Sequence, residues 1–159
     1  MRDDQAVVVL AASSTRPRVV IADDYRLVLS ALRKELESAG FDVCGEALTG
    51  AEALESIYAT SPDLALLDVH MPEGGGDELA VVLAREMPEV KVVLLTATAD
   101  EDEAIEALRS GALGYLEKTI SSRRLAHVLR EVSNGEIAFP RRFMPRIARE
   151  LRCTVVPAA

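Results

Sequence analysis

The sequence is poor in cysteine, aromatic residues and long apolar runs. Of its 159 residues two are cysteines, none is tryptophan, and 4% are aromatic. Cys44 and Cys153 lie too far apart to predict a disulfide framework or a cysteine metal cluster, which is typical of a protein of the reducing cytoplasm. No apolar run approaches the roughly 20 residues that cross a bilayer. The run at residues 7–12 is short and follows acidic residues, so it does not predict a signal peptide.

Basic residues are outnumbered, and the formal net charge is −8 at pH 7. An acidic body disfavours nonspecific binding to nucleic acid or to an anionic membrane. Five arginines do lie after residue 140, namely Arg141, Arg142, Arg146, Arg149 and Arg152. They predict weak, salt-sensitive contact with nucleic acid at most. We therefore expect no specific DNA binding by this chain alone and no membrane partner.

What the sequence does contain is a regular alternation of two patterns. Five stretches are typical of strands: residues 18–22, 41–45, 64–69, 90–95 and 113–116. After each of them, apolar residues repeat every three or four positions, as they do on one face of a helix. Strands that are joined through helices run parallel with right-handed crossovers. The pattern therefore predicts a doubly wound α/β sandwich of three layers.

The predicted domain spans residues 17–134. Residues 1–16 are expected to be an N-terminal extension, because serine, threonine and proline interrupt the pattern before the first strand. Residues 135–159 are expected to be a C-terminal linker that contains a short helix from Pro145 to Leu151. Helix starts inside the domain are predicted from capping residues at Thr49, at Asp100, and at Ser121 or Ser122.

Polar side chains gather at the downstream ends of the predicted strands. Four strand ends supply them: Asp23 and Asp24, Asp68, Thr96, and Lys118. The carboxyl ends of parallel strands share one edge of the sheet, and ligands of open α/β sheets bind there. Asp68 lies at the downstream end of the stretch 64–69, whose other residues are all apolar, and such a run indicates a strand buried on both faces. We therefore expect these side chains to form one site around Asp68.

Three clustered carboxylates repel one another, and at least one pKa rises unless a cation lies among them. Mg²⁺ is the cation that suits oxygen ligands beside a phosphate. Lys118 offers a positive charge to a phosphate oxygen, and Thr96 offers a hydroxyl donor. A carboxylate can also act as a nucleophile and become an aspartyl phosphate. The set predicts metal-assisted phosphoryl transfer onto Asp68.

Each of these residues has a simpler structural interpretation. Asp23 and Asp24 could cap a helix, Asp68 could be a turn residue, and the other side chains could be structural or solvated. All of these interpretations would have to hold together at four strand ends. The combination therefore favours the functional interpretation.

With these motifs in this order, the sequence resembles the receiver domain of two-component response regulators. The similarity covers about residues 18–134 and rests on residues 21–24, 66–72, 95–97 and 111–118. Residues 45–47 and 111–116 are similar to the NarL/LuxR-type subgroup, but the helix-turn-helix domain of that subgroup is absent. A stand-alone receiver and a piece of a longer chain both remain open. The resemblance implies a flavodoxin-like (βα)5 fold with strand order 2-1-3-4-5.

The resemblance also implies a role for each site residue. Asp68 would be the phosphoacceptor, and Lys118 would bind the phosphoryl group. Asp24, Asp68 and the backbone carbonyl of His70 would bind Mg²⁺ directly, with Asp23 acting through water. Thr96 and Tyr115 would be the switch pair that reports phosphorylation. The expected partners are a sensor histidine kinase or a small phosphodonor, and a partner or second copy at the surface of the last two helices and the fifth strand.

Two segments depart from the family pattern. Gly74, Gly75 and Gly76 replace a more usual mixed run after the acceptor, and this predicts a more mobile loop. Thr119 follows the lysine, where the family often has Pro, Asp or Asn. The side chain of His70 is expected at the rim of the site rather than in catalysis, and His127 is expected to be solvated.

Two other functions compete with a phosphorylation switch. A phosphatase of the haloacid dehalogenase type needs a second acid two positions after the nucleophile, and here that position is His70. A phosphorylation-independent, receiver-like interaction domain would need only the shape, and the complete acid, threonine and lysine set argues against it. We therefore expect a signalling switch that phosphorylates and slowly dephosphorylates itself, rather than a turnover enzyme.

Overall fold

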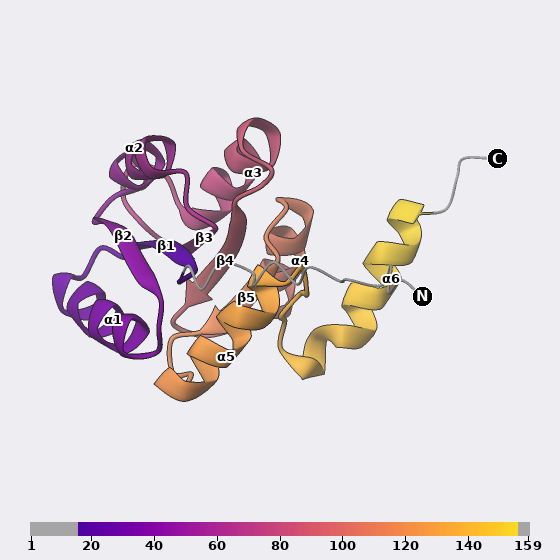
Figure 1. Cartoon of the computed structure of the whole chain (residues 1–159). Helices are drawn as coiled ribbons and strands as arrows, with labels where there is room; N and C mark the ends of the chain where they lie inside the picture. Colours follow the sequence, from indigo (N-terminus) through magenta and orange to yellow (C-terminus); the bar gives the residue numbers. More distant parts are fainter. Residues whose placement is uncertain (1–15, 156–159) are drawn as a thin grey trace, which may run out of the picture.

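The structure, a computed structural model, describes residues 16–155 of the chain. The predicted apolar stretch at residues 6–12 lies outside the described residues. Five parallel strands form one sheet in the order β2-β1-β3-β4-β5 (Figure 1). Their bounds are Arg18–Ala22 for β1, Asp42–Ala47 for β2, Leu64–Asp68 for β3, Lys91–Thr96 for β4 and Gly114–Glu117 for β5. The predicted fold class and strand order are confirmed; the bounds of β1 are as predicted, and those of the other strands differ by one or two residues.

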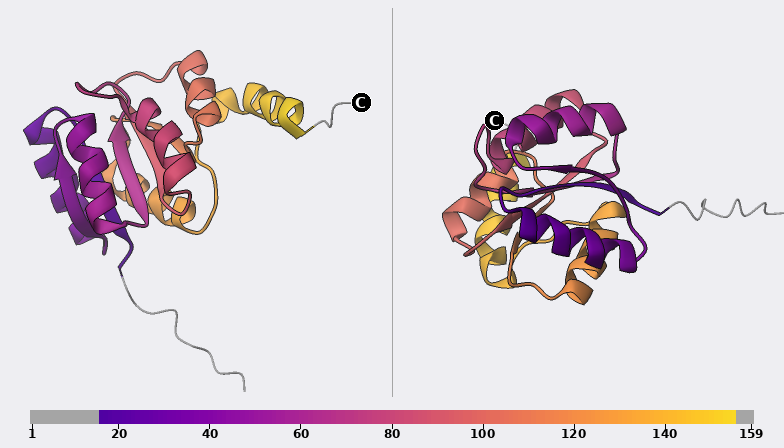
Figure 2. Two further views of the ribbon diagram at one scale, coloured as in Figure 1. Left: turned by 90° about the horizontal axis from the view of Figure 1, so that it is seen from above. Right: turned by 90° about the vertical axis from the view of Figure 1, so that its left-hand side faces the viewer.

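Helices cover both faces of the sheet (Figure 2). One face is packed by α1 (Arg26–Ser38) and α5 (Ser122–Ser133), and the other by α2 (Gly50–Thr60), α3 (Gly76–Glu86) and α4 (Glu101–Arg109). Among the described residues, no helix has both the length and the apolar character needed to span a membrane.

The central strand β3 is buried along its whole length. Leu64 and Leu66 pack in the layer of α1 and α5, while Ala65 and Leu67 pack in the layer of α2, α3 and α4. A strand between two helical layers has no solvent face, which is why its sequence is apolar without alternation. Asp68 is the last residue of this strand, so its carboxylate lies at the carboxyl end of the sheet.

The predicted capping residues start their helices. Oγ1 of Thr49 accepts the N–H of Glu52 at 3.2 Å, and Glu52 Oε2 accepts the N–H of Leu48 at 2.9 Å, one residue before the cap itself. Asp100 caps α4, and Ser121 rather than Ser122 caps α5. These caps satisfy N–H groups that the first turn of a helix leaves without partners.

The C-terminal region is more ordered than a linker with a short helix. A 3-10 turn at Arg141–Phe143 leads into α6 (Met144–Val155), which begins one residue before Pro145 and runs past Leu151. Proline is tolerated in a first turn because its missing N–H would have no partner there. The side chains of Phe143 and Ile147 are buried against the body. Beyond them, α6 projects away from the domain (Figure 2).

Candidate functional site

Asp68 lies at the end of β3 with both carboxylate oxygens engaged. Oδ1 accepts the backbone N–H of His70 at 3.0 Å, and Oδ2 accepts a hydrogen bond from Lys118 Nζ at 2.9 Å. The residue is 5% exposed. A carboxylate held from two sides at a strand end has a fixed orientation, which is what a nucleophile needs.

Asp23 joins the same charge cluster from the end of β1. It is fully buried, and its Oδ1 accepts the N–H of Tyr25 at 2.9 Å. Its Oδ2 lies 2.6 Å from Nζ of Lys118, so the ammonium group sits between two carboxylates. The backbone N–H of Lys118 donates to the carbonyl of Thr96 at 2.8 Å. This bond ties the ends of β4 and β5 together at the site.

The environment shifts the pKa of both partners upward. Burial raises the pKa of Asp68, and the hydrogen bonds from Lys118 and from His70 N–H offset part of that rise. For Lys118, burial acts to lower the pKa, but the hydrogen bonds to Asp23 and Asp68 outweigh it and the pKa is raised. Lys118 is therefore charged at neutral pH, and Asp68 is a more basic carboxylate than one in water.

The acids fit a divalent cation. One carboxylate oxygen from each of Asp23, Asp24 and Asp68 lies within 4.8 Å of the others. Asp24 is exposed, so one side of the cluster is open to solvent. An all-oxygen donor set of this charge suits a hard cation that keeps part of its water shell, and Mg²⁺ has these properties.

The glycine loop after Asp68 owes part of its composition to close packing. A Cβ on Gly75 would lie 2.3 Å from the carbonyl oxygen of Val69, and a Cβ on Gly76 would lie 2.6 Å from that of Asp68. Gly74 has a φ of +109°, a conformation that side chains disfavour. The glycines therefore allow the loop to return tightly against β3. The predicted mobility of this loop stays a prediction.

The two residues predicted as the switch pair are both buried. Thr96 is 2% exposed and donates to the carbonyl of Thr98 at 3.3 Å. Tyr115 is fully buried, and its hydroxyl accepts the N–H of Asp100 at 3.0 Å. Burial raises the pKa of Tyr115, while the Asp100 N–H and the Thr96 hydroxyl act against that rise. The Tyr115 ring thus occupies the interior in this structure, and its role as a switch residue stays a prediction.

Sequence reasoning missed Glu103 on α4. Its Oε1 accepts the hydroxyl hydrogen of Tyr115 at 2.7 Å, and its Oε2 lies 3.1 Å from Nε2 of His70. The imidazole is otherwise exposed at the rim, as predicted, and His127 is exposed on α5 beside Glu131. Glu103 is one of three acidic residues in the first turn of α4, with Glu101 and Asp102, and no sequence motif distinguishes it from the other two.

Comparisons with known proteins agree with this geometry. The family model described as the response regulator receiver domain matches residues 19–130. The transcriptional regulatory protein YhcZ of Bacillus subtilis is 34% identical over 136 residues, which are 85% of this chain and 63% of YhcZ. The DNA-binding transcriptional activator DevR/DosR of Mycobacterium tuberculosis is 33% identical over the same shares. The chain thus spans about 63% of the length of these relatives.

Solved structures give the same result for the fold. The signal receiver domain of the putative response regulator NarL from Mycobacterium tuberculosis superposes with a TM-score of 0.74 at 33% identity, covering 76% of this chain and 98% of that one. A CheY-like receiver domain protein from Methanospirillum hungatei superposes with a TM-score of 0.71 at 28% identity, covering 76% of this chain and 95% of that one.

Proposed function

Because this chain belongs to the family of response regulator receiver domains, whose general function is phosphorylation-based signalling, we propose that its signalling reaction is phosphoryl transfer to Asp68. The observation that carries the assignment is the Lys118 ammonium held between the buried carboxylates of Asp23 and Asp68. That arrangement concentrates a nucleophile and a phosphate-binding cation at one sheet edge.

In the proposed reaction, a carboxylate oxygen of Asp68 forms a bond to the phosphorus of the donor. The phosphorus–nitrogen bond of a phosphohistidine breaks, or the phosphorus–oxygen bond of acetyl phosphate, and the leaving group takes the electron pair. Asp68 Oδ1 is oriented by the His70 N–H. Lys118 already contacts Oδ2, so its charge can follow the new phosphoryl oxygens without crossing the site.

Receiver domains generally bind Mg²⁺ at an acidic pocket, and the acids of this chain provide one. We propose that Asp24, Asp68 and the backbone carbonyl of His70 hold the ion directly, with Asp23 acting through water. The bound ion supplies positive charge that neutralises the incoming phosphoryl oxygens. In this assignment Asp23 keeps its hydrogen bond from Tyr25 and fixes the end of β1.

The output is proposed to run through Thr96 and Tyr115. An added phosphoryl group carries roughly two negative charges, and it places strong hydrogen-bond acceptors beside Thr96. The Thr96 hydroxyl then exchanges the carbonyl of Thr98 for a phosphoryl oxygen, and Tyr115 shifts within the interior. One hydrogen bond does not reverse a 1:99 equilibrium, which takes about 5.5 kcal/mol, so a partner or second copy must supply the rest.

The proposed setting is the cytoplasm, where a sensor histidine kinase or a small phosphodonor loads the site. We propose that residues 16–155 act as a switch rather than as a turnover enzyme and that they bind no specific DNA sequence. We treat residues 17–134 as the receiver domain, with the segments before and after it as extensions.

Intact mass spectrometry tests the assignment. Acetyl phosphate with Mg²⁺ should add one phosphoryl group to the wild type and none to Asp68→Asn, because an amide is not a nucleophile. Full labelling of Asp68→Asn would reject Asp68 as the acceptor. A wild type that stays unlabelled would instead favour the phosphorylation-independent interaction domain.

A further inference from the structure

The chain's own C-terminal segment, residues 136–155, lies on the side of the domain formed by β5 and α4. Ala138 donates its N–H to the carbonyl of Leu113 at 2.8 Å and accepts the N–H of Tyr115 at 2.8 Å. A parallel bridge joins Ala138 to Gly114. The segment therefore extends the sheet by one short pairing and covers the open edge that β5 would otherwise present.

Apolar side chains anchor the segment beyond that pairing. The ring of Phe139 stacks on the ring of Tyr115 with centroids 6.5 Å apart and an interplanar angle of 27°. Phe143 and Ile147 are 7% and 0% exposed, and they belong to the same buried cluster as Ala104 and Ala107 of α4. Burial of this kind is the main force that holds one element on another.

Charge complementarity orients the segment on α4. Arg142 pairs with Glu117 at 3.0 Å, Arg109 of α4 pairs with Glu150 at 3.0 Å, and Arg146 pairs with Asp102. Residues 141–155 carry five arginines and one glutamate, a charge of +4 in a chain whose net charge is −8. Because these pairs are partly exposed, they contribute little binding energy each and mainly set the register.

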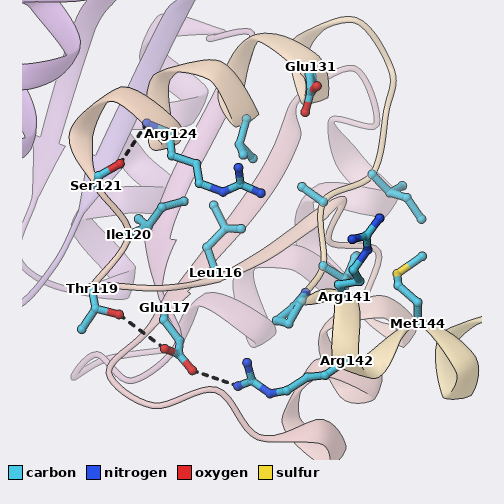
Figure 3. A pocket seen from close by; sticks show the side chains of 15 residues that line it. Leu116, Glu117, Thr119, Ile120, Ser121, Arg124, Glu131, Arg141, Arg142 and Met144 are labelled. Atoms are coloured by element: carbon cyan, nitrogen blue, oxygen red, sulfur yellow. Dashed lines mark hydrogen bonds and ion pairs between the residues drawn. The ribbon is translucent and has the colours of Figure 1, made fainter.

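The opposite side of the segment is loosely packed. A cavity of about 860 Å³ lies between α5 and the segment, with Leu116 and Val128 among its apolar lining (Figure 3). At one end of this cavity the guanidinium of Arg142 donates a hydrogen bond to the carboxylate of Glu117, as the dashed line in Figure 3 shows. Glu136 at the start of the segment donates its N–H to the α5 carbonyl of Glu131, and the anchoring contacts further along are with β5 and α4. A segment with so few contacts on one side is easier to displace than a core element.

From these contacts we infer that the β5–α4 face is an intramolecular docking surface, that residues 136–155 are its resident occupant, and that phosphorylation of Asp68 loosens them. The inference rests on the proposed function for the phosphorylation step. Its consequence is that a partner or second copy that uses this face must compete with the chain's own segment.

Tyr115 is the reason that phosphorylation should loosen the segment rather than tighten it, because Tyr115 contacts both Thr96 and the segment. Its hydroxyl lies among Asp100, Glu103 and Thr96, while its ring and its N–H hold Phe139 and Ala138. When Thr96 turns toward a phosphoryl group, space opens on the Thr96 side of the ring. A ring that moves there leaves Phe139 and weakens the stacking that anchors the segment.

Limited trypsin digestion of the full chain tests the inference, because the segment carries its own arginine cleavage sites. Each sample is digested with Mg²⁺ alone or with Mg²⁺ and beryllofluoride, a phosphoryl mimic, and the fragments are identified by mass. Cleavage after Arg141 and Arg142 should accelerate several-fold with beryllofluoride, because a docked backbone resists proteolysis. Cleavage after Arg85, exposed on α3, reports global opening and should not change.

Two variants separate docking from general stability. Phe139→Ala removes the stacking partner, so its segment should be cleaved rapidly with and without beryllofluoride. Asp68→Asn should stay at the slow wild-type rate in both conditions.

Intact mass after acetyl phosphate treatment separates this inference from the proposed function. If the wild type is labelled but beryllofluoride leaves segment cleavage unchanged or slows it, the docking inference is overturned and the proposed function stands. If the wild type is not labelled, both are rejected.

Discussion

The hydroxyl of Tyr115 donates its hydrogen to Glu103 at 2.7 Å, and the second carboxylate oxygen of Glu103 lies 3.1 Å from Nε2 of His70. The backbone N–H of His70 in turn donates to Asp68. A short series of contacts thus runs from the acceptor carboxylate over α4 to the buried tyrosine. This series is separate from the expected route through Thr96, and it joins α4 to the loop after β3.

A double-mutant cycle measures this link. Tyr115→Phe and Glu103→Ala each remove the bond between the two side chains, so their losses of unfolding free energy should not add. We expect a coupling energy of about 1 kcal/mol, the usual net value of a hydrogen bond. Urea unfolding of the wild type, the two single variants and the double variant provides it. Glu106→Ala on the same helix is the control and should be additive with Tyr115→Phe, because Glu106 pairs with Arg109 instead.

Asp24→Ala tests the metal assignment. The variant should lose Mg²⁺-dependent labelling by acetyl phosphate while it keeps the nucleophile, since an exposed ligand rather than Asp68 is removed. The measurement is labelled mass against Mg²⁺ concentration. Glu78→Ala is the control, because Glu78 is an exposed acid on α3 that lines the same surface pocket as Asp24. Normal labelling of Asp24→Ala without Mg²⁺ would mean that the metal assignment is wrong.

Asp68→Asn should stabilise the protein in Mg²⁺-free buffer at neutral pH. Burial raises the pKa of Asp68 in the folded chain above its ordinary value of 3.8. At a pH between 3.8 and that raised pKa, the folded chain binds a proton that the unfolded chain has released. The free energy of unfolding of the wild type therefore falls as pH rises through that window, and the loss persists above it. Asparagine carries no charge and avoids this loss.

Thermal melts in the presence of a chelator test whether Asp68→Asn raises or lowers the stability. At pH 7 we expect the Tm of Asp68→Asn to be higher than that of the wild type. The advantage of Asp68→Asn should shrink as the pH is lowered toward 4. An advantage that is equal at both pH values would show that charge burial is not its cause.

Thr96→Ala separates phosphorylation from response. The variant should still accept phosphate on Asp68, because the hydroxyl contacts Thr98 rather than the carboxylate. It should lose most of the association that beryllofluoride induces, since the hydrogen bond that draws position 96 toward the phosphoryl group is gone. Sedimentation velocity with and without beryllofluoride gives the readout. Thr98→Ala, an exposed neighbour, is the control, and equal association of Thr96→Ala and the wild type would contradict this coupling.

The sequence was sufficient to predict the fold and the gathering of Asp23, Asp24, Asp68, Thr96 and Lys118 at one edge, because strand period and strand ends are local signals. It was not sufficient for Glu103, whose contacts with Tyr115 and His70 depend on how α4 packs. The length and docking of α6 were also missed. The burial of Phe143 just before α6, and of Ile147 within it, depends on contacts with residues some forty positions earlier, and no local pattern reports such contacts.

The loop after Asp68 offers the sharpest test of how packing supports the site. A Cβ on Gly76 would lie 2.6 Å from the carbonyl oxygen of Asp68 and 2.8 Å from Cδ2 of Leu94, although the backbone of Gly76 is helical. Gly76→Ala should therefore push the end of β3, cost about 1–3 kcal/mol of stability and slow acetyl phosphate labelling.

Gly135→Ala is the matched comparison for that substitution. Gly135 has a φ of +95°, but an added Cβ meets nothing within 4 Å. The variant should lose about 1 kcal/mol from backbone strain and keep the labelling rate of the wild type. Urea unfolding and a time course of labelled mass distinguish the two effects. If Gly76→Ala is destabilised but labels at the wild-type rate, the position of Asp68 does not depend on the close approach of this loop, and the glycines serve the turn alone.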